Sequence, residues 1–163
     1  MQDRFRNDSG YILIESIIAI TIVVVGLLGI FSLLSRSLSL NRVVSDRFVA
    51  AYLAAEGVEI VKNMIDNNIL AGKPWNAGLA TGTYEADDSD IALRSDGNTP
   101  LRFDAGTGAY GYSGPVPTAI RRAITLDVSP DGEEIAVGSR ASWTTRGGGK
   151  FSIYLEEHLF NWR

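Results

Sequence analysis

The sequence YILIESIIAITIVVVGLLGIFSLL occupies residues 11–34, and it is the most apolar stretch of the chain. Within it, residues 17–34 form a run of 18 residues without charge or proline. A helix rises about 1.5 Å per residue, so this run is roughly 27 Å long as a helix, close to the thickness of a bilayer's hydrocarbon core. We therefore predict a membrane-spanning helix in this part of the chain.

Two other interpretations of the apolar run fit less well. A secretory signal peptide has an apolar region of about 7–15 residues and a small-x-small cleavage site after it, and this run is longer and has no such site. A buried helix of a soluble domain needs a larger polar remainder to enclose it. The orientation in a membrane is not decided by charge, because Arg4 and Arg6 precede the run and Arg36, Arg42 and Arg47 follow it.

Glu15 is the only charged residue between Tyr11 and Leu34. A carboxylate near the start of a membrane helix is costly and usually has a partner. Two explanations stay open at this point. Glu15 either lies hydrated at headgroup depth, or it pairs with a cation from another chain or from a newly formed N-terminus.

Composition excludes several classes of function. The 163-residue chain has no cysteine, which excludes disulfides, thiolate metal sites and a cysteine nucleophile, and its one histidine, His158, disfavours histidine-based triads and His-rich metal sites. A net charge of −4 without a basic patch makes nucleic acid a poor partner, and no Walker sequence is present. We therefore expect neither an enzyme nor a bound cofactor or metal.

The segment Ser9-Gly-Tyr-Ile-Leu-Ile-Glu15 resembles the processing site of type IV prepilins and pseudopilins. The resemblance implies a leader, residues 1–10, that a prepilin peptidase removes after Gly10. It also implies N-methylation of Tyr11 and a role in assembly for Glu15, the fifth residue of the mature chain. The sequence departs from the family pattern in four ways. Tyr11 stands where phenylalanine is usual, the leader is charge-balanced, no proline interrupts the apolar helix, and the C-terminal cysteine pair is missing.

The resemblance extends beyond the anchor. Residues 54–63, AAEGVEIVKN, and the ending LFNW at 159–162 are similar to minor pilins of the PilV type. This implies an α+β, pilin-like fold in four parts, which are a leader (1–10), a transmembrane and filament-core helix (11–35), an amphipathic helix (36–68) and a loop-rich antiparallel β head (69–163).

The function implied is that of a minor type IV pilin or pseudopilin, a structural subunit of a pilus or secretion pseudopilus. The implied partners are prepilin peptidase, other pilin subunits, an inner-membrane assembly platform and, before assembly, membrane lipid. The chain would first be a single-pass inner-membrane protein with a cytoplasmic N-terminus. The alternative is a membrane-anchored binding or adhesion module that never polymerises. An anchored hydrolase has no supporting residues.

Residues 35–68 predict a continuation of the apolar helix. They contain no proline, and an apolar stripe at helical spacing faces away from Arg47, Lys62 and Asp66. The stripe consists of Val49, Leu53, Ile60 and Met64, with Gly57 among them. We expect one helix from about Ile12 to Asn67, with Gly57 allowing close packing on a sheet.

Alternation of apolar and polar residues predicts a three-stranded antiparallel meander over 121–128, 134–145 and 150–157. Short strands are expected at 82–85 and 101–104. One face of the meander is apolar, and the amphipathic helix is the element available to cover it.

Four further features are interpreted as structural. The sequence Gly106-x-Gly108-x-x-Gly111 matches a dinucleotide fingerprint but is followed by a Pro-rich stretch where that motif needs a helix, so we predict a glycine-rich loop. Glu85, Asp87, Asp88 and Asp90 lack EF-hand spacing, and we expect a solvated acidic loop in place of a calcium site. His158 is expected to be an exposed histidine of the tail. The aromatic residues of the head are expected to pack in the core or loops and not to form an adhesive patch; these are Tyr110, Tyr112, Trp143, Tyr154 and Trp162.

Overall fold

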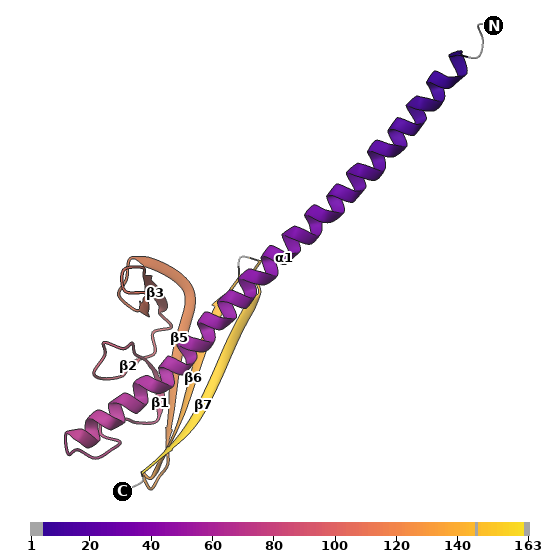
Figure 1. Ribbon diagram of the computed structural model, residues 1–163. Coiled ribbons are helices and arrows are strands. Elements are labelled where there is room, and N and C mark those ends of the chain that lie inside the picture. Colours follow the sequence, from indigo (N-terminus) through magenta and orange to yellow (C-terminus); the bar gives the residue numbers. More distant parts are fainter. Residues whose placement is uncertain (1–4, 146, 162–163) are drawn as a thin grey trace. The chain divides into compact units, whose positions relative to one another are not determined.

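The computed structural model describes the backbone of residues 5–145 and 147–161, and within these ranges the side chains from Gly10 onward (Figure 1). One helix, α1 (Phe5–Leu70), is followed by strands that all belong to one antiparallel sheet. The chain divides into two compact units, the first ending at Val44 and the second, which holds the sheet, beginning at Ser45. The architecture is α+β, as predicted.

Helix α1 is longer at both ends than the predicted span of residues 12–67. It contains no proline, and each of its glycines costs only about 1 kcal/mol in a helix interior, so Gly10 does not prevent the helix from beginning at Phe5. The helix ends where Gly72 adopts a φ of 68°, a left-handed conformation that suits glycine. There the N–H of Gly72 donates to the Ile69 carbonyl at 3.0 Å, and that of Lys73 donates to Asn68 at 2.9 Å.

The predicted meander is present as β5 (Val116–Val128), β6 (Glu134–Thr144) and β7 (Lys150–Phe160). Strand β5 is central, because it also pairs with β1 (Gly82–Glu85) and β3 (Pro100–Asp104). It begins five residues before the predicted position, and β7 extends three residues beyond it. The short strands predicted at 82–85 and 101–104 are confirmed as β1 and β3.

Two strands were absent from the sequence prediction. β2 (Arg94–Ser95) pairs with β1, and β4 (Ala109–Gly111) pairs with β3. Strands of two and three residues are too short to show alternation. The turn between β3 and β4 contains Gly106 and Gly108, the latter with a φ of 74°. The glycine-rich segment is therefore part of a hairpin turn at residues 106–108, as predicted, but its residues 109–111 form β4 and not a loop.

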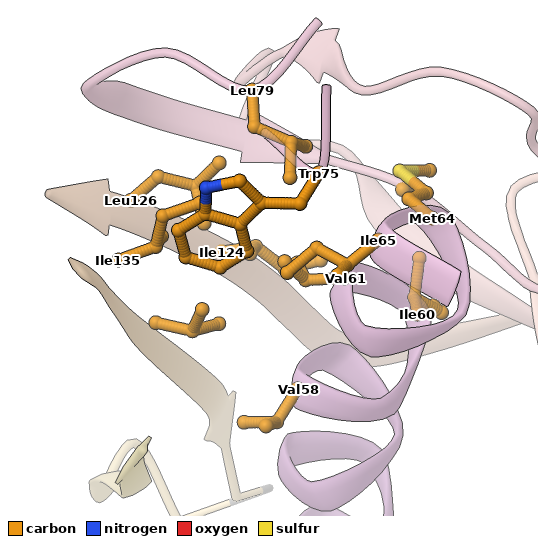
Figure 2. Packing of buried hydrophobic residues seen from close by; sticks show 12 residues of the cluster. Val58, Ile60, Val61, Met64, Ile65, Trp75, Leu79, Ile124, Leu126 and Ile135 are labelled. Atoms are coloured by element: carbon orange, nitrogen blue, oxygen red, sulfur yellow. The ribbon is translucent and has the colours of Figure 1, made fainter. Parts of the chain in front are cut away.

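The core lies between the distal part of α1 and one face of the sheet. The predicted helical stripe is confirmed, since Leu53, Ile60 and Met64 are buried and Val49 is half-buried. The alternating residues of the sheet bury the opposing surface, namely Ile124, Leu126, Ile135, Val137, Ala141 and Trp143. Figure 2 shows the Trp75 ring lying among Leu79, Ile124, Leu126 and Ile135. Its Nε1 donates a hydrogen bond to the Gly132 carbonyl at 3.0 Å.

Gly57 lies against β6, as predicted from its place in the stripe. A Cβ atom at this position would lie 2.3 Å from Ser139 Oγ and 3.1 Å from Arg122 Cδ. Both Gly57 and Ser139 are buried. The absence of a side chain at Gly57 thus lets this turn of α1 lie directly on the sheet.

Candidate functional site

The predicted processing segment lies inside α1. Gly10, Tyr11 and Glu15 all have helical backbone conformation, and all three are exposed. No heavy atom outside the local helix lies within 4 Å of the position that a Gly10 Cβ would take. Within the described side chains nothing covers the Gly10–Tyr11 bond, and this bond lies inside the helix, whereas the predicted helix begins at about Ile12.

Tyr11 and Glu15 are four residues apart in this helix and so lie one above the other on one face. Tyr11 is 76% exposed. Glu15 makes no ion pair or hydrogen bond through its side chain with any other part of the chain that the structure describes. Its carboxylate is thus available to a cation from outside the fold or to an amine created at Tyr11.

The hydroxyl groups on the neighbouring turns are satisfied locally. Ser16 Oγ donates to the Ile12 carbonyl at 2.7 Å, and Thr21 Oγ1 donates to the Ile17 carbonyl at 2.7 Å. Such bonds remove the cost of placing a hydroxyl in hydrocarbon. These bonds were not predicted, although a Ser or Thr inside an apolar helix is a signal for such a bond.

The apolar part of α1 could cross a membrane. Its most apolar 18-residue window has a mean hydropathy of 2.9, and none of that window is buried within the chain. Among the residues described, α1 is the one helix long and apolar enough for this. A single-pass membrane protein is therefore compatible with the structure, as predicted.

A buried arginine joins α1 to the sheet in the second unit. Arg122, on β5, is 1% exposed, and it donates to the Leu53 carbonyl at 3.2 Å and to the Ala86 carbonyl at 2.6 Å. Its Nη1 also lies 3.2 Å from Glu56 Oε2 on α1. Arg122 was not predicted as a site residue, although the alternation through Ile124 and Leu126 places it, and not Arg121, on the inward face of β5.

The acidic segment is less solvated than predicted. Glu85 and Asp87 are buried. Glu85 accepts a hydrogen bond from the Thr99 N–H at 2.5 Å, and Asp87 accepts from the Tyr112 N–H at 3.0 Å and from Ser89. The prediction of a solvated loop is therefore wrong for these two carboxylates, which hold the loops of the head together. Asp88 is exposed, as predicted.

Burial alone would raise the pKa of Asp87, but its hydrogen bonds from Ser89 and Tyr112 and the nearby Arg94 outweigh burial and lower that pKa below its usual value. Asp90 pairs with Arg94 at 2.8 Å. No cluster of three or more acidic or histidine side chains in the described ranges has an arrangement that could hold a metal ion. The oxygens of this segment instead accept hydrogen bonds from the protein itself.

His158 lies in β7 and not in a free tail. Its Nδ1 is 2.5 Å from Glu134 Oε1 on β6, and its Nε2 is 3.3 Å from Glu156 Oε1. The hydrogen bonds to Glu134 and then to Glu156 raise the pKa of His158 above its ordinary value. The side chain is exposed, as predicted, but it is the centre of a polar cluster on the outer face of the sheet.

Among the described residues, the aromatic side chains of the head differ in their surroundings. Trp143 is buried against Phe151, with ring centroids 5.7 Å apart. Tyr112 is half-buried, and burial raises its pKa to about 12. Tyr154 is exposed on β7, so the expected packing in the core or loops is wrong for it, and its ring centroid lies 4.8 Å from the Arg140 guanidinium carbon. Trp162 lies outside the described residues.

Comparison with known proteins identifies no relative. No family model matches the chain, and no curated protein or solved structure is significantly similar to it.

Proposed function

We propose that this protein is a minor type IV pilin or pseudopilin, processed by prepilin peptidase and assembled through its N-terminal helix into a pilus or secretion pseudopilus. The observation that carries the proposal is the order Gly10-Tyr11-(x)3-Glu15 at the entry to an uncharged run. The continuation of that run as one helix onto a small antiparallel sheet supports it. The function is structural.

Processing would change the charge of the segment. Cleavage after Gly10 leaves a free amine on Tyr11, one helical turn from the Glu15 carboxylate. A carboxylate in hydrocarbon is costly, and a cation beside it offsets much of that cost. In an assembling bundle, Glu15 pairs with the amine of its own or a neighbouring subunit. The pair forms only when the incoming helix lies at one axial position relative to its neighbour. We therefore expect the pair to fix the axial register between subunits more than to add stability.

The same proposal orients the chain. Residues 1–10 lie in the cytoplasm with the peptidase, the apolar helix spans the inner membrane, and the β head lies outside it. Lipid surrounds the helix before assembly, and neighbouring helices replace the lipid afterwards. The exposure of the apolar window within the isolated chain fits this exchange.

The test is to express wild type, Gly10→Val and Glu15→Ala chains together with the filament machinery and to compare membrane and sheared-filament fractions. Gly10→Val should remain a full-length membrane precursor, because a branched side chain crowds the scissile position. Glu15→Ala should be processed and inserted but be depleted about tenfold in filaments. Glu15→Gln serves as the matched control for shape, and it should behave like Glu15→Ala if charge is what matters.

Equal incorporation of wild type and Glu15→Ala would remove Glu15 from assembly. An uncut wild-type chain that remains in the membrane and functions there would instead favour the membrane-anchored binding module that does not polymerise.

A further inference from the structure

A groove runs along α1 on the head. Two adjoining hollows share Glu56 and Asp88. One lies between α1 and residues 87–93, and the other lies between α1 and the β3–β4 hairpin. Together they follow α1 from Val49 to Asn68, roughly 28 Å at the helical rise.

The groove is acidic. Five carboxylates line it, against one basic side chain, Lys73. The carboxylates belong to Glu56, Glu59, Asp87, Asp88 and Asp90. Glu56 and Asp90 are paired with arginines, but Glu59 and Asp88 are exposed and form no ion pair with the described residues. The last turn of α1 carries no basic residue, so its carbonyl end adds to the negative field.

The groove also exposes apolar groups that the fold leaves uncovered. Ile91 is 99% exposed and Tyr52 is 76% exposed, one in each hollow. Half-buried Leu93 and Tyr110 lie beside them. An exposed isoleucine next to unpaired carboxylates is suited to a ligand with both apolar and cationic side chains.

We propose that this groove is the docking site for a basic amphipathic segment of a partner protein, with lysine or arginine side chains at Glu59 and Asp88 and apolar side chains on Ile91 and Tyr52. The proposal stands independently of whether the chain enters a filament.

Charge complementarity selects this occupant over the alternatives. The acidic groove repels anionic lipid headgroups and nucleic acid. A second copy of this chain carries a net charge of −4, which disfavours its approach to an acidic groove. A metal ion would compete for Asp87 and Asp90 with the N–H and guanidinium groups that they already accept from.

The test uses the full chain in nanodiscs of zwitterionic phosphatidylcholine and a fluorescein-labelled peptide of about twelve residues that alternates lysine and leucine. Fluorescence anisotropy at low salt gives the Kd. The double variant Glu59→Gln/Asp88→Asn should raise the Kd about tenfold or more. The matched control Asp127→Asn/Glu133→Gln removes the same charge from exposed positions outside the groove and should change the Kd less than about twofold.

Ile91→Ser should weaken the lysine–leucine peptide about fivefold while leaving a lysine–serine peptide unaffected, which tests the apolar contact. The matching glutamate–leucine peptide should not bind. Three results would overturn the proposal, namely equal losses in the groove and control variants, no loss in the groove variant, and displacement of the peptide by submillimolar calcium. The last of these would assign the groove to a metal ion.

Discussion

A methyl group added at Gly57 should lower the stability of the head. Gly57→Ala places a Cβ atom 2.3 Å from Ser139 Oγ, against a sheet that is fixed by its own ladder. Overpacking of this kind costs about 1–3 kcal/mol, while the better helix propensity of alanine returns up to about 1 kcal/mol. We expect a net loss of about 1–2 kcal/mol, measured by urea unfolding of the detergent-solubilised chain with tryptophan fluorescence.

A double variant identifies the cause of that loss. Ser139→Ala removes the hydroxyl that the new Cβ would meet, and this hydroxyl has no hydrogen-bond partner among the described residues. Ser139→Ala alone should be neutral, and Gly57→Ala/Ser139→Ala should recover part of the stability. Strictly additive effects would show that Gly57 matters for a reason other than this contact.

Arg122 is the second side chain whose removal should destabilise the head. Arg122→Ala leaves a cavity and takes the donors from the Leu53 and Ala86 carbonyls, so we expect a loss of about 3–5 kcal/mol. Arg122→Met fills most of the space, and Glu56, whose side chain is 34% exposed, can be hydrated, so this variant should lose much less. The same unfolding measurement checks both, and an alanine variant as stable as wild type would contradict the role given to Arg122.

Strands β6 and β7 carry a pH-dependent contact on their outer face. The pKa of His158 is raised by Glu134 and then Glu156, so the contact stabilises the fold fully below the unfolded histidine pKa of about 6.5. That contribution is lost as the pH rises through the folded pKa. The melting temperature of wild type should therefore exceed that of His158→Gln at pH 6, and the two should converge at pH 9. Since the group is exposed, the gap is small, and a gap independent of pH would contradict this explanation.

Periodicity in the sequence predicted the elements that bury a face. The structure buries the predicted helical stripe through Leu53, Ile60 and Met64 and the alternating apolar residues of β5 and β6. These patterns are visible in the sequence because an element that buries one face must place apolar residues on that face. On the edge strand β7, the same alternation predicts burial less well. Leu155 alternates with the core residues of β7, yet it remains 39% exposed.

Features that depend on a distant partner could not be predicted. β2 exists because it pairs with β1, and the roles of Glu85 and Asp87 depend on Thr99 and Tyr112. The helix start at Phe5 differs from the predicted Ile12 because no residue near Gly10 stops the helix. In the candidate processing site, sequence alone supplied Gly10, Tyr11 and Glu15, while the structure added their helical conformation and their exposure.

The head as a whole should not depend on a divalent cation. The carboxylate oxygens of Asp87 and Asp90 already accept hydrogen bonds from the protein. The core cluster that contains Trp75 is apolar and so offers no metal ligands. Addition of EDTA or of millimolar calcium should shift the melting temperature of the full chain by less than about 2 °C. A much larger drop with EDTA that calcium reverses would assign a metal-dependent role to the acidic segment.

The chain combines Gly10, Tyr11 and, one helical turn after Tyr11, Glu15, with an uncharged run at residues 17–34 directly beyond them. The proposed function depends on this segment being cut, and mass spectrometry of the N-terminal peptide tests that most directly. The chain is isolated from membranes and filaments of cells that contain prepilin peptidase, with Gly10→Val as the uncut control. We expect a chain that begins at N-methylated Tyr11. A wild-type chain that still begins at Met1 or Gln2 in both fractions would contradict it.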